Sequence, residues 1–273
     1  MKVNEGIAVS TSKILLVPYD AHHVERYHKW MQDEALREAT ASDLLTLEEE
    51  CENQQSWRSA HDKLTFIVCQ PAAPPAAPAA SPSVTDGGAP AMVVVAGDDD
   101  APPRMVGDVN LFLTPCDDDD DDDDDDADGE DAREGSAREV KGEVDIMIAA
   151  PEHRRRGLGE AAVRAFLRFL AGRHGDVMRE YARGAGDARL RRLVAKINAD
   201  NAGSIRLFEN LGFRRDGGPD YFNEISMVLA DFSPPASTAA AAASETGVAG
   251  AEDGVLGYRE CLYDRSRLKT GEM

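Results

Sequence analysis

Residues 143–159 read EVDIMIAAPEHRRRGLG, and this stretch decides the fold. Its start alternates, which predicts a strand with Glu143, Asp145 and Met147 on one face and Val144, Ile146 and Ile148 on the other. A basic, glycine-bearing turn follows at residues 154–159. After the turn, apolar side chains recur at helical spacing at Val163, Phe166, Leu167 and Leu170. Strand, turn and helix in this order predict a βα unit whose helix begins at the turn.

The turn is suited to an anion. Gly157 and Gly159 allow a tight turn, so that successive backbone N–H groups converge at a helix N-terminus. Arg154, Arg155 and Arg156 add positive charge, which favours a pyrophosphate. The pattern is neither a GxGxxG turn nor a phosphate loop that ends in GK[ST]. The six residues alone also allow a solvated basic turn before an ordinary helix.

Apolar runs on both sides of this unit predict the other elements of a mixed α/β fold. Strands are expected at 13–19, 64–69, 105–113 and 192–197 and around 225–229. Helices are expected after Asp20, from a capping box at Thr46 and Glu49 to about Trp57, and over 202–211. Residues 172–190 are compatible with a further loop. The order β α α β β β α β α β is that of one domain with a central mixed sheet flanked by helices.

Three stretches lack the large apolar side chains that folding requires, namely residues 71–104, 115–139 and 233–251. We therefore expect one domain over residues 1–230, interrupted by insertions at 71–104 and 115–139. The first insertion is interpreted as a long hairpin connection between two strands. Residues 231–273 are expected to form a low-complexity linker and tail.

The formal net charge of -21 comes mostly from one window. Residues 98–131 hold 17 acidic residues against the single base Arg104 and so supply -16, which leaves -5 for the rest of the chain. Ten of these acids are consecutive aspartates at residues 117–126, interpreted as a solvated insertion. Since the chain has no excess of Lys and Arg, we expect no nucleic-acid partner.

Other protein classes are also disfavoured. The four cysteines show no CxxC spacing and fit a reducing compartment; they are Cys51, Cys69, Cys116 and Cys261. No apolar run approaches the roughly 18 residues of a membrane span, and residues 1–12 do not resemble a secretory signal. We expect a cytoplasmic protein with no membrane partner, and a nuclear location stays open.

A second block, NAGSIRLFENLGF, follows at residues 201–213. Together with the turn, it resembles the GNAT superfamily of acetyl-CoA-dependent N-acetyltransferases. The family's Q/R-x-x-G-x-G/A signature matches Arg154, Gly157 and Gly159, and its N-x-x-S…L-G-F form matches Asn201, Ser204 and residues 211–213. The flanks KILLVPYDAHHVERYHKWM (13–31) and VGDVNLFL (106–113) resemble the N-acetyltransferase 9-like proteins. The resemblance covers nearly all of residues 1–230 outside the insertions.

The resemblance implies acetyl-CoA as co-substrate and no metal. Met147, Ile148 and Ala149 would line the pantetheine and thioester, and the Met147 amide would polarise the thioester carbonyl. The backbone amides that would hold the pyrophosphate are those of Arg154, Arg155, Arg156, Gly157, Leu158, Gly159 and Glu160. Asn201 would contact the pantetheine or a bridging water, and Ser204 belongs to the same block.

The resemblance also implies a general base. Glu143 lies fourteen residues before Gly157, where histone-acetylating relatives keep this base, and Asp145 on the same face is the second candidate. At pH 7 a lysine amine of pKa ~10.4 needs about 4.6 kcal/mol of help to lose its proton, and an α-amine of pKa ~7.8 needs about 1. A lysine acetylator therefore needs a strong base, whereas an N-terminal acetylator can work through Glu143 and water. The resemblance implies a protein acceptor, most readily an N-terminal α-amine such as that of tubulin subunits, and a lysine acceptor stays open. The alternative for each carboxylate is a solvent-facing strand residue.

One departure concerns the general acid. Many superfamily members have a tyrosine just before the L-G-F block, whereas this chain has Phe208, which has no proton to give. Tyr221 is a candidate substitute, but the acid stays unassigned. Phe208 and the insertions motivate the alternative of a non-catalytic adaptor with the same fold, for example a microtubule-associated one. Acetylation of small-molecule amines has no positive support in the sequence.

Three further groups receive structural interpretations. His22, His23 and His28 are expected on the surface of one helix and not as metal ligands, since the sequence shows no partner ligands. Trp30 and Trp57 are expected in the core. Arg189, Arg191 and Arg192 are expected on an exposed face before a strand.

Overall fold

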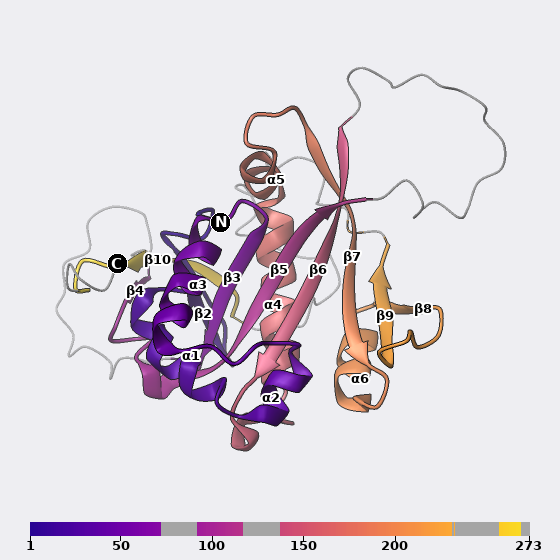
Figure 1. Ribbon diagram of the computed structural model, residues 1–273. Coiled ribbons are helices and arrows are strands. Elements are labelled where there is room, and N and C mark those ends of the chain that lie inside the picture. Colours follow the sequence, from indigo (N-terminus) through magenta and orange to yellow (C-terminus); the bar gives the residue numbers. More distant parts are fainter. Residues whose placement is uncertain (72–91, 117–136, 231, 233–256, 269–273) are drawn as a thin grey trace.

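The computed structural model of the protein describes residues 1–71, 92–116, 137–230, 232 and 257–268 (Figure 1). Ten strands form one mixed sheet in the order β4-β10-β1-β2-β3-β5-β6-β7-β9-β8. The strands are β1 Ile7–Ser10, β2 Leu15–Pro18, β3 Lys63–Cys69, β4 Val93–Val95, β5 Met105–Pro115, β6 Arg138–Ile148, β7 Ala188–Asn198, β8 Arg214–Asp216, β9 Glu224–Leu229 and β10 Arg259–Asp264. The helices are α1 Val24–Trp30, α2 Glu34–Ala39, α3 Leu47–Ser59, α4 Leu158–Gly172, α5 His174–Ala182 and α6 Ala202–Asn210, with short 3-10 turns η1 Ala21–His23, η2 Pro102–Arg104 and η4 Pro151–His153.

Apolar clusters fill the space on both sides of the sheet. On one side, Phe66 of β3 packs edge-on against Phe166 and Phe169 of α4, with ring centroids 6.1 and 5.1 Å apart. Helices α5 and α6 contribute to the same cluster. On the other side, Tyr27 and Trp30 of α1 pack against each other and against the sheet. The mixed α/β fold with helices on both faces is thus as predicted.

The predicted βα unit is formed by β6 and α4. Side chains of β6 alternate as expected, because Val144 is buried among the residues that pack on α4 and Met147 among those that pack on α1. The predicted capping box is also present at the start of α3. There, the Glu49 carboxylate accepts from the Thr46 amide and Thr46 Oγ1 accepts from the Glu49 amide. Strong local patterns therefore determine these elements.

Short or polar elements were not predicted. Helix α5 occupies part of residues 172–190, and β1, α2 and β8 are additional. The strands β6 and β7 also begin earlier than expected. Their first residues pair with each other and include Arg138 and Arg189, whose side chains are exposed. Segments with many exposed polar side chains show little apolar periodicity, so a prediction based on that periodicity misses them.

The expected insertion at 71–104 and the tail at 231–273 need correction, because each contributes a strand. Strand β10 pairs antiparallel with β1 and parallel with β4, so the domain extends past residue 230. Cys261 and Tyr263 of β10 are buried, and this alternate burial attaches the strand to the sheet. The apolar alternation of β10 is short, and the Ala-, Gly- and Pro-rich residues around it led to the expectation of a low-complexity tail. Residues 72–91, 117–136 and 233–256, where the rest of these expectations fall, lie outside the described residues.

The two tryptophans differ in burial. Trp30 lies in the core, as expected. Trp57 packs edge-on against Phe112 at 5.6 Å but is only partly buried.

Replacing Phe66 by alanine should lower the free energy of unfolding by about 3–5 kcal/mol, because the ring is fully buried against two α4 phenylalanines and its loss leaves a cavity. Urea denaturation followed by circular dichroism measures the change. Leu44→Ala is the control, since Leu44 is 60% exposed and its truncation should stay within about 0.5 kcal/mol. Equal effects of the two changes would contradict the assignment of Phe66 to the centre of the core.

Candidate active site

The strands β6 and β7 pair over only part of their length. Paired positions run from Arg138 opposite Ala188 to Glu143 opposite Val194. Beyond them, β6 continues beside β5 to Ile148, and β7 continues beside β9. Within the described residues no paired position joins β6 to β7 after Glu143, and the two strands diverge toward the start of α4 (Figure 1). The β6 peptide groups that face β7 there have no strand partner.

The register shows which peptide groups these are. Ala149 donates its N–H to the Val106 carbonyl oxygen, on the β5 side, at 2.9 Å. Because successive residues of a strand point their peptide groups in opposite directions, Met147 also faces β5. The N–H groups of Ile146 and Ile148 therefore point into the opening between β6 and β7.

This geometry corrects the sequence-based role of the Met147 amide. A Cβ atom at Gly107 of β5 would lie 1.8 Å from the Met147 carbonyl oxygen, so this oxygen is directed at β5 and only glycine fits opposite it. The amides that point into the opening are those of Ile146 and Ile148. The direction of a peptide group depends on pairing with a distant strand, and no local pattern predicts it.

The basic turn connects the end of β6 to the start of α4. Gly157 has φ 74° and occupies the N-cap of α4 in the left-handed region, which favours glycine. The first helical bond runs from Ala161 N to Gly157 O, so the preceding amides have no acceptor within the helix. The predicted anion-binding amides of residues 157–160 thus lie at a helix N-terminus next to the end of β6.

The three arginines of the turn have different environments. Arg154 donates from Nε to the Ile148 carbonyl oxygen at 2.9 Å and from Nη2 to the Ala149 carbonyl oxygen at 2.8 Å. It therefore braces the turn against β6. Arg155 and Arg156 are exposed and form no hydrogen bond or ion pair with the rest of the described chain, which leaves their charges available to an anion.

Sequence reasoning missed a fourth cation at this turn. The Lys13 Nζ atom lies 3.4 Å from the point that a Cβ at Gly157 would occupy. Lys13 belongs to the turn between β1 and β2, and it meets α4 only because both lie at one end of the sheet. Lys13 is far from the turn in the sequence, so no local pattern indicates this contact.

Glycine at position 159 has a packing reason. A Cβ there would come within 3.1 Å of Leu207 Cδ1 on α6 and 3.7 Å of the Ile146 and Ile148 side chains. Gly159 thus lets the first turn of α4 lie close to both α6 and β6.

The second sequence block forms helix α6 and its cap. Asn201 Oδ1 accepts from the Ser204 amide at 3.1 Å, which is an N-cap bond, so these residues hold the start of α6. Phe208 is buried and packs edge-on against Phe213 at 5.0 Å. Tyr221 is 95% exposed in the loop before β9 and touches the ring of Phe222. The general acid remains unassigned.

The acidic face of β6 adjoins the opening. Glu143 lies 3.6 Å from Lys196 of β7, measured from Oε2 to Nζ, and its side chain is 36% exposed. Asp145 is partly buried, and burial raises the pKa of its carboxyl to about 7, with further increases from the charges of Glu143, Asp108 and Glu224 and a decrease from Lys196. A carboxylate that titrates near neutrality can take a proton from an amine.

A buried carboxylate lies on the neighbouring strand. Asp108 of β5 accepts from the Tyr27 hydroxyl at 3.1 Å and from Asn110 Nδ2 at 2.9 Å, both at Oδ2. Burial raises the pKa of Asp108 to about 6, although these two donors act in the opposite direction. Asn110 is directly opposite Asp145 in the sheet. The sequence analysis missed this network because its members lie far apart in the chain.

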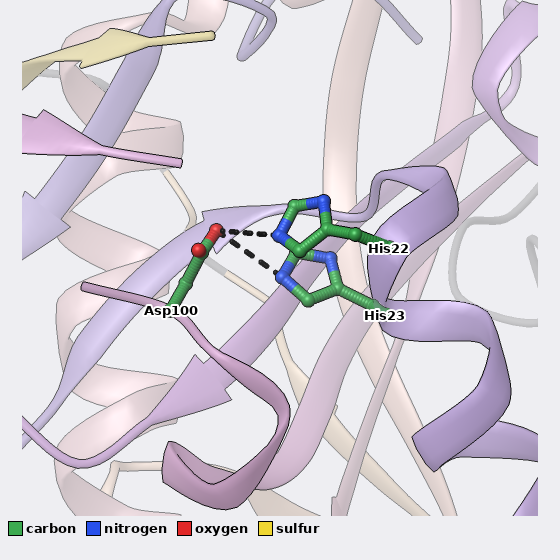
Figure 2. A group of neighbouring side chains, drawn as sticks. All are labelled: His22, His23 and Asp100. Carbon is green, nitrogen blue, oxygen red and sulfur yellow. Dashed lines mark hydrogen bonds and ion pairs between the residues drawn. The ribbon is translucent and has the colours of Figure 1, made fainter. Parts of the chain in front are cut away.

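The expectation that His22 and His23 are surface groups is wrong. Figure 2 shows both rings pointing at Asp100, and each Nε2 lies 3.2 Å from Asp100 Oδ2. Tyr263 of β10 donates to the same oxygen at 2.5 Å, and the Gly97 amide donates to Oδ1 at 2.6 Å. The error arose because Asp100 lies in a segment whose composition suggested an unfolded insertion.

The hydrogen bonds of this His-Asp cluster (His22, His23 and Asp100) do not fit a metal ion. His23 Nδ1 accepts from the Asp20 amide at 3.1 Å, so in the neutral ring Nε2 carries the hydrogen and donates to Asp100. Burial lowers the pKa of His23, which favours that neutral ring. A metal ligand would need a lone pair on Nε2. The cluster instead ties η1 to the β4–β5 connection and to β10.

The remaining basic group lies within β7. Arg189 and Arg191 are exposed as expected but belong to the strand, which begins at Ala188, and Arg191 forms an ion pair with Glu139 at 2.7 Å. None of the helices in the described part of the chain is long and apolar enough to cross a membrane.

Comparison with known proteins agrees with this geometry. The family described as Acetyltransferase (GNAT) domain matches residues 13–214. The chain belongs to the GNAT acetyltransferase family. It is therefore an acetyl-CoA-dependent N-acetyltransferase, as the signature turn and the second block predicted.

Individual relatives cover most of the chain. It is 36% identical over 230 residues to an N-acetyltransferase 9-like protein from Caenorhabditis briggsae, which covers 84% of this chain and 88% of that protein. It is 34% identical over 227 residues to the alpha/beta-tubulin-N-acetyltransferase 9 of Drosophila melanogaster, with 83% and 88% covered. Among solved structures, the ribosomal L7/L12 alpha-N-protein acetyltransferase RimL in complex with coenzyme A matches with 13% identity and a TM-score of 0.47, over 81% of this chain and 95% of that one. The predicted resemblance to the N-acetyltransferase 9-like proteins is confirmed.

Replacing both Arg155 and Arg156 by alanine should weaken acetyl-CoA binding about ten-fold, because the two unpaired charges beside the α4 N-terminus attract the pyrophosphate. Isothermal calorimetry at 0.15 M salt measures the change. The matched control replaces Arg179 and Arg183, in and just after α5, which removes the same charge away from the turn. Equal loss in both double variants would indicate a general effect of net charge.

Replacing Asp100 by asparagine should destabilise the protein at pH 7 by about 2 kcal/mol, because it removes the charge that His23 and Tyr263 hydrogen-bond and that His22 approaches at 3.2 Å. Burial alone would raise the pKa of Asp100, but the hydrogen bonds from His22 and His23 outweigh it and hold the pKa well below its usual range. This stabilisation is present above the unfolded pKa and lost at lower pH. The difference between wild type and Asp100→Asn should therefore narrow below about pH 4 in urea denaturation. A constant difference from pH 7 to pH 3 would contradict a charged Asp100.

Proposed function

We propose that this enzyme acetylates the N-terminal α-amine of a protein, with the acceptor approaching the opening from the acidic face of β6. The observation that carries the proposal is the position of Asp145, which lies partly buried next to the point where β6 and β7 part. Burial there raises the pKa of its carboxyl to about 7. An α-ammonium of pKa ~7.8 can pass its proton to such a carboxylate at a cost of roughly 1 kcal/mol, whereas a lysine of pKa ~10.4 would require about 4.6 kcal/mol. Asp145 is therefore matched to an α-amine.

The opening suits acetyl-CoA as co-substrate. When bound, acetyl-CoA supplies a thioester whose C–S bond breaks as the amine nitrogen forms a C–N bond with the acetyl carbon, and the CoA thiol is released. In the proposed arrangement, the amides of Ile146 and Ile148 donate to the carbonyl oxygen as it becomes negative. The N-terminal amides of α4, Arg155, Arg156 and Lys13 provide positive potential for the pyrophosphate.

The two carboxylates of the acidic face receive different roles in this proposal. Asp145 is the more buried one and accepts the proton from the attacking amine. Glu143, which the sequence ranked first, is paired with Lys196 at the point where the strands part, and in our proposal its charge attracts the incoming ammonium. Support for this division comes from their different burial and partners.

Tubulin subunits are the acceptors that we propose to test first, because the Drosophila melanogaster relative is named for them. The acceptor panel pairs tubulin and N-terminal peptides with the same peptides after blocking of the α-amine, so that α-amine and lysine acetylation are separated. Labelled acetyl groups should appear on free α-amines. Binding of acetyl-CoA without transfer to any amine of the panel would instead favour the non-catalytic adaptor.

Asp145→Asn should lower kcat/KM for N-terminal peptides at least ten-fold, because general-base assistance typically contributes a factor of about 100 or more. Glu143→Gln should also lower it by about ten-fold, chiefly through KM, since the acceptor loses an attracting charge. Initial rates with labelled acetyl-CoA give both constants. Glu139→Gln, on the same strand but paired with Arg191 on the surface, is the control and should retain wild-type activity. Full activity in Asp145→Asn would remove that residue from the mechanism.

A further inference from the structure

Asp108 is a carboxylate that neither the signature nor the opening explains. It is 1% exposed, and the groups that bind it are neutral donors, Tyr27 and Asn110. No Lys or Arg of the described residues forms an ion pair with it. Burying a carboxylate among neutral groups is costly, and such groups are concentrated at functional sites. The position of Asp108 relative to Asp145 indicates what it does.

Asp108 and Asp145 lie diagonally across one face of the sheet. On paired strands β5 and β6, Asn110 is opposite Asp145 and Asp108 is opposite Met147. Opposite residues of antiparallel strands project to the same side, so the three polar side chains share the face that packs on α1. Asn110 is thus the immediate neighbour of both carboxylates.

The Asn110 amide links the two acids. Its Nδ2 donates to Asp108, which fixes the orientation of the amide, and its Oδ1 is buried without a hydrogen-bond partner among the described residues. A buried acceptor needs a donor. Once Asp145 has taken a proton, its carboxyl can be that donor, directly or through one water. The second carboxylate oxygen of Asp108, Oδ1, is also buried and has no hydrogen-bond partner among the described residues. Asp108 and Asn110 can therefore each accept one more hydrogen bond.

We propose that Asp108 is a positioning residue for proton transfer: a fixed, buried anion that acts through Asn110 and Asp145 when Asp145 takes the proton of the acceptor amine. The inference rests on the proposed function, in which Asp145 is the base. Asp108 does not touch the reacting atoms. The negative charge of Asp108 favours the protonated form of Asp145. The hydrogen bond from Asn110 Nδ2 to Asp108 orients the amide so that Asn110 Oδ1 can accept the hydrogen of the protonated Asp145 carboxyl.

The surroundings of both groups agree with this role. Asp145 is faced by Glu143 on its own strand, Asp108 on β5, Lys196 on β7 and Glu224 on β9. After burial, the charges of Glu143 and Asp108 are the largest influences that raise its pKa, and Lys196 opposes them. Asp108 itself is faced by the Tyr27 hydroxyl and by Asn110, and its charge in turn raises the pKa of Tyr27 and of Tyr19 next to it. Glu50 of α3 also raises the pKa of both tyrosines.

The test is the pH dependence of kcat/KM for an N-terminal peptide, measured on the full chain. In wild type the acidic limb should lie near pH 7, since Asp145 must be deprotonated to act. Asp108→Asn removes the neighbouring negative charge and lowers the pKa of Asp145, so this limb should move to lower pH by about half a unit or more. A merely structural Asp108 would change the amount of folded enzyme at every pH and leave the limb in place.

Two comparisons keep the outcome decisive. Glu139→Gln makes the same change in net charge on β6, the strand of Asp145, and should leave the acidic limb unmoved. Tyr27→Phe removes one of the two donors to Asp108, favours its protonated form and should move the limb in the same direction by less. Calorimetric binding of acetyl-CoA verifies that each variant is folded. If Asp108→Asn does not bind acetyl-CoA, the acidic limb of Tyr27→Phe is the measurement that tests the proposal.

The results separate the two proposals. If wild type transfers no acetyl group to α-amines, the proposed function fails. If wild type is active and the folded Asp108→Asn and Tyr27→Phe variants keep its acidic limb, the proposed function stands and the role of Asp108 is overturned. A limb that moves in both variants but not in Glu139→Gln supports Asp108 as the positioning residue.

Discussion

The site depends on one constraint, namely that β6 keeps its pairing with β5 to Ile148 but loses its pairing with β7 after Glu143. A strand in the middle of a sheet normally has both edges satisfied. Here one edge is left open for the last residues of β6, and the chain then turns directly into α4. The unpaired strand amides and the unpaired helix N-terminus are therefore brought to the same end of the sheet by chain connectivity.

The two faces of β6 also differ in chemical character. From Val140 to Ile148 its even-numbered residues are apolar or glycine and lie on the face that packs toward α4. Its odd-numbered residues include Glu143 and Asp145 and face α1, where Asp108 and Tyr27 lie. Negative charge is thus kept on one side of β6 and positive potential on the other side and at its end. A basic turn beside two acids would otherwise be neutralised by ion pairing, and neither an anion nor an ammonium would be attracted.

Sequence patterns predicted those features of the site that depend on residues close together in the chain. The alternation of residues 143–148, the Gly157 turn and the start of α4 follow from side chains within a few residues of one another. Lys13, Asp108 and Asn110 could not be assigned, because register and sheet order bring them to the site from distant segments. The direction of the Met147 amide depends on register in the same way. The His-Asp cluster was missed for a different reason: Asp100 is buried through contacts with η1 and β10, which composition around it cannot reveal.

Strand geometry relates the proposed base to the proposed oxyanion donor. Asp145 and Ile146 are consecutive, with Cα atoms about 3.8 Å apart. The side chain of Asp145 stands out of the sheet toward the acceptor face, whereas the Ile146 N–H lies in the plane of the sheet and points toward β7. In the proposed mechanism, Asp145 would therefore meet the amine from the acidic face and the neighbouring Ile146 amide would meet the thioester in the opening. Pairing with β7 ends at Glu143, and the Ile146 N–H faces the gap beyond this last paired position. The point where the strands part thus fixes both groups at once, and no loop has to position either of them.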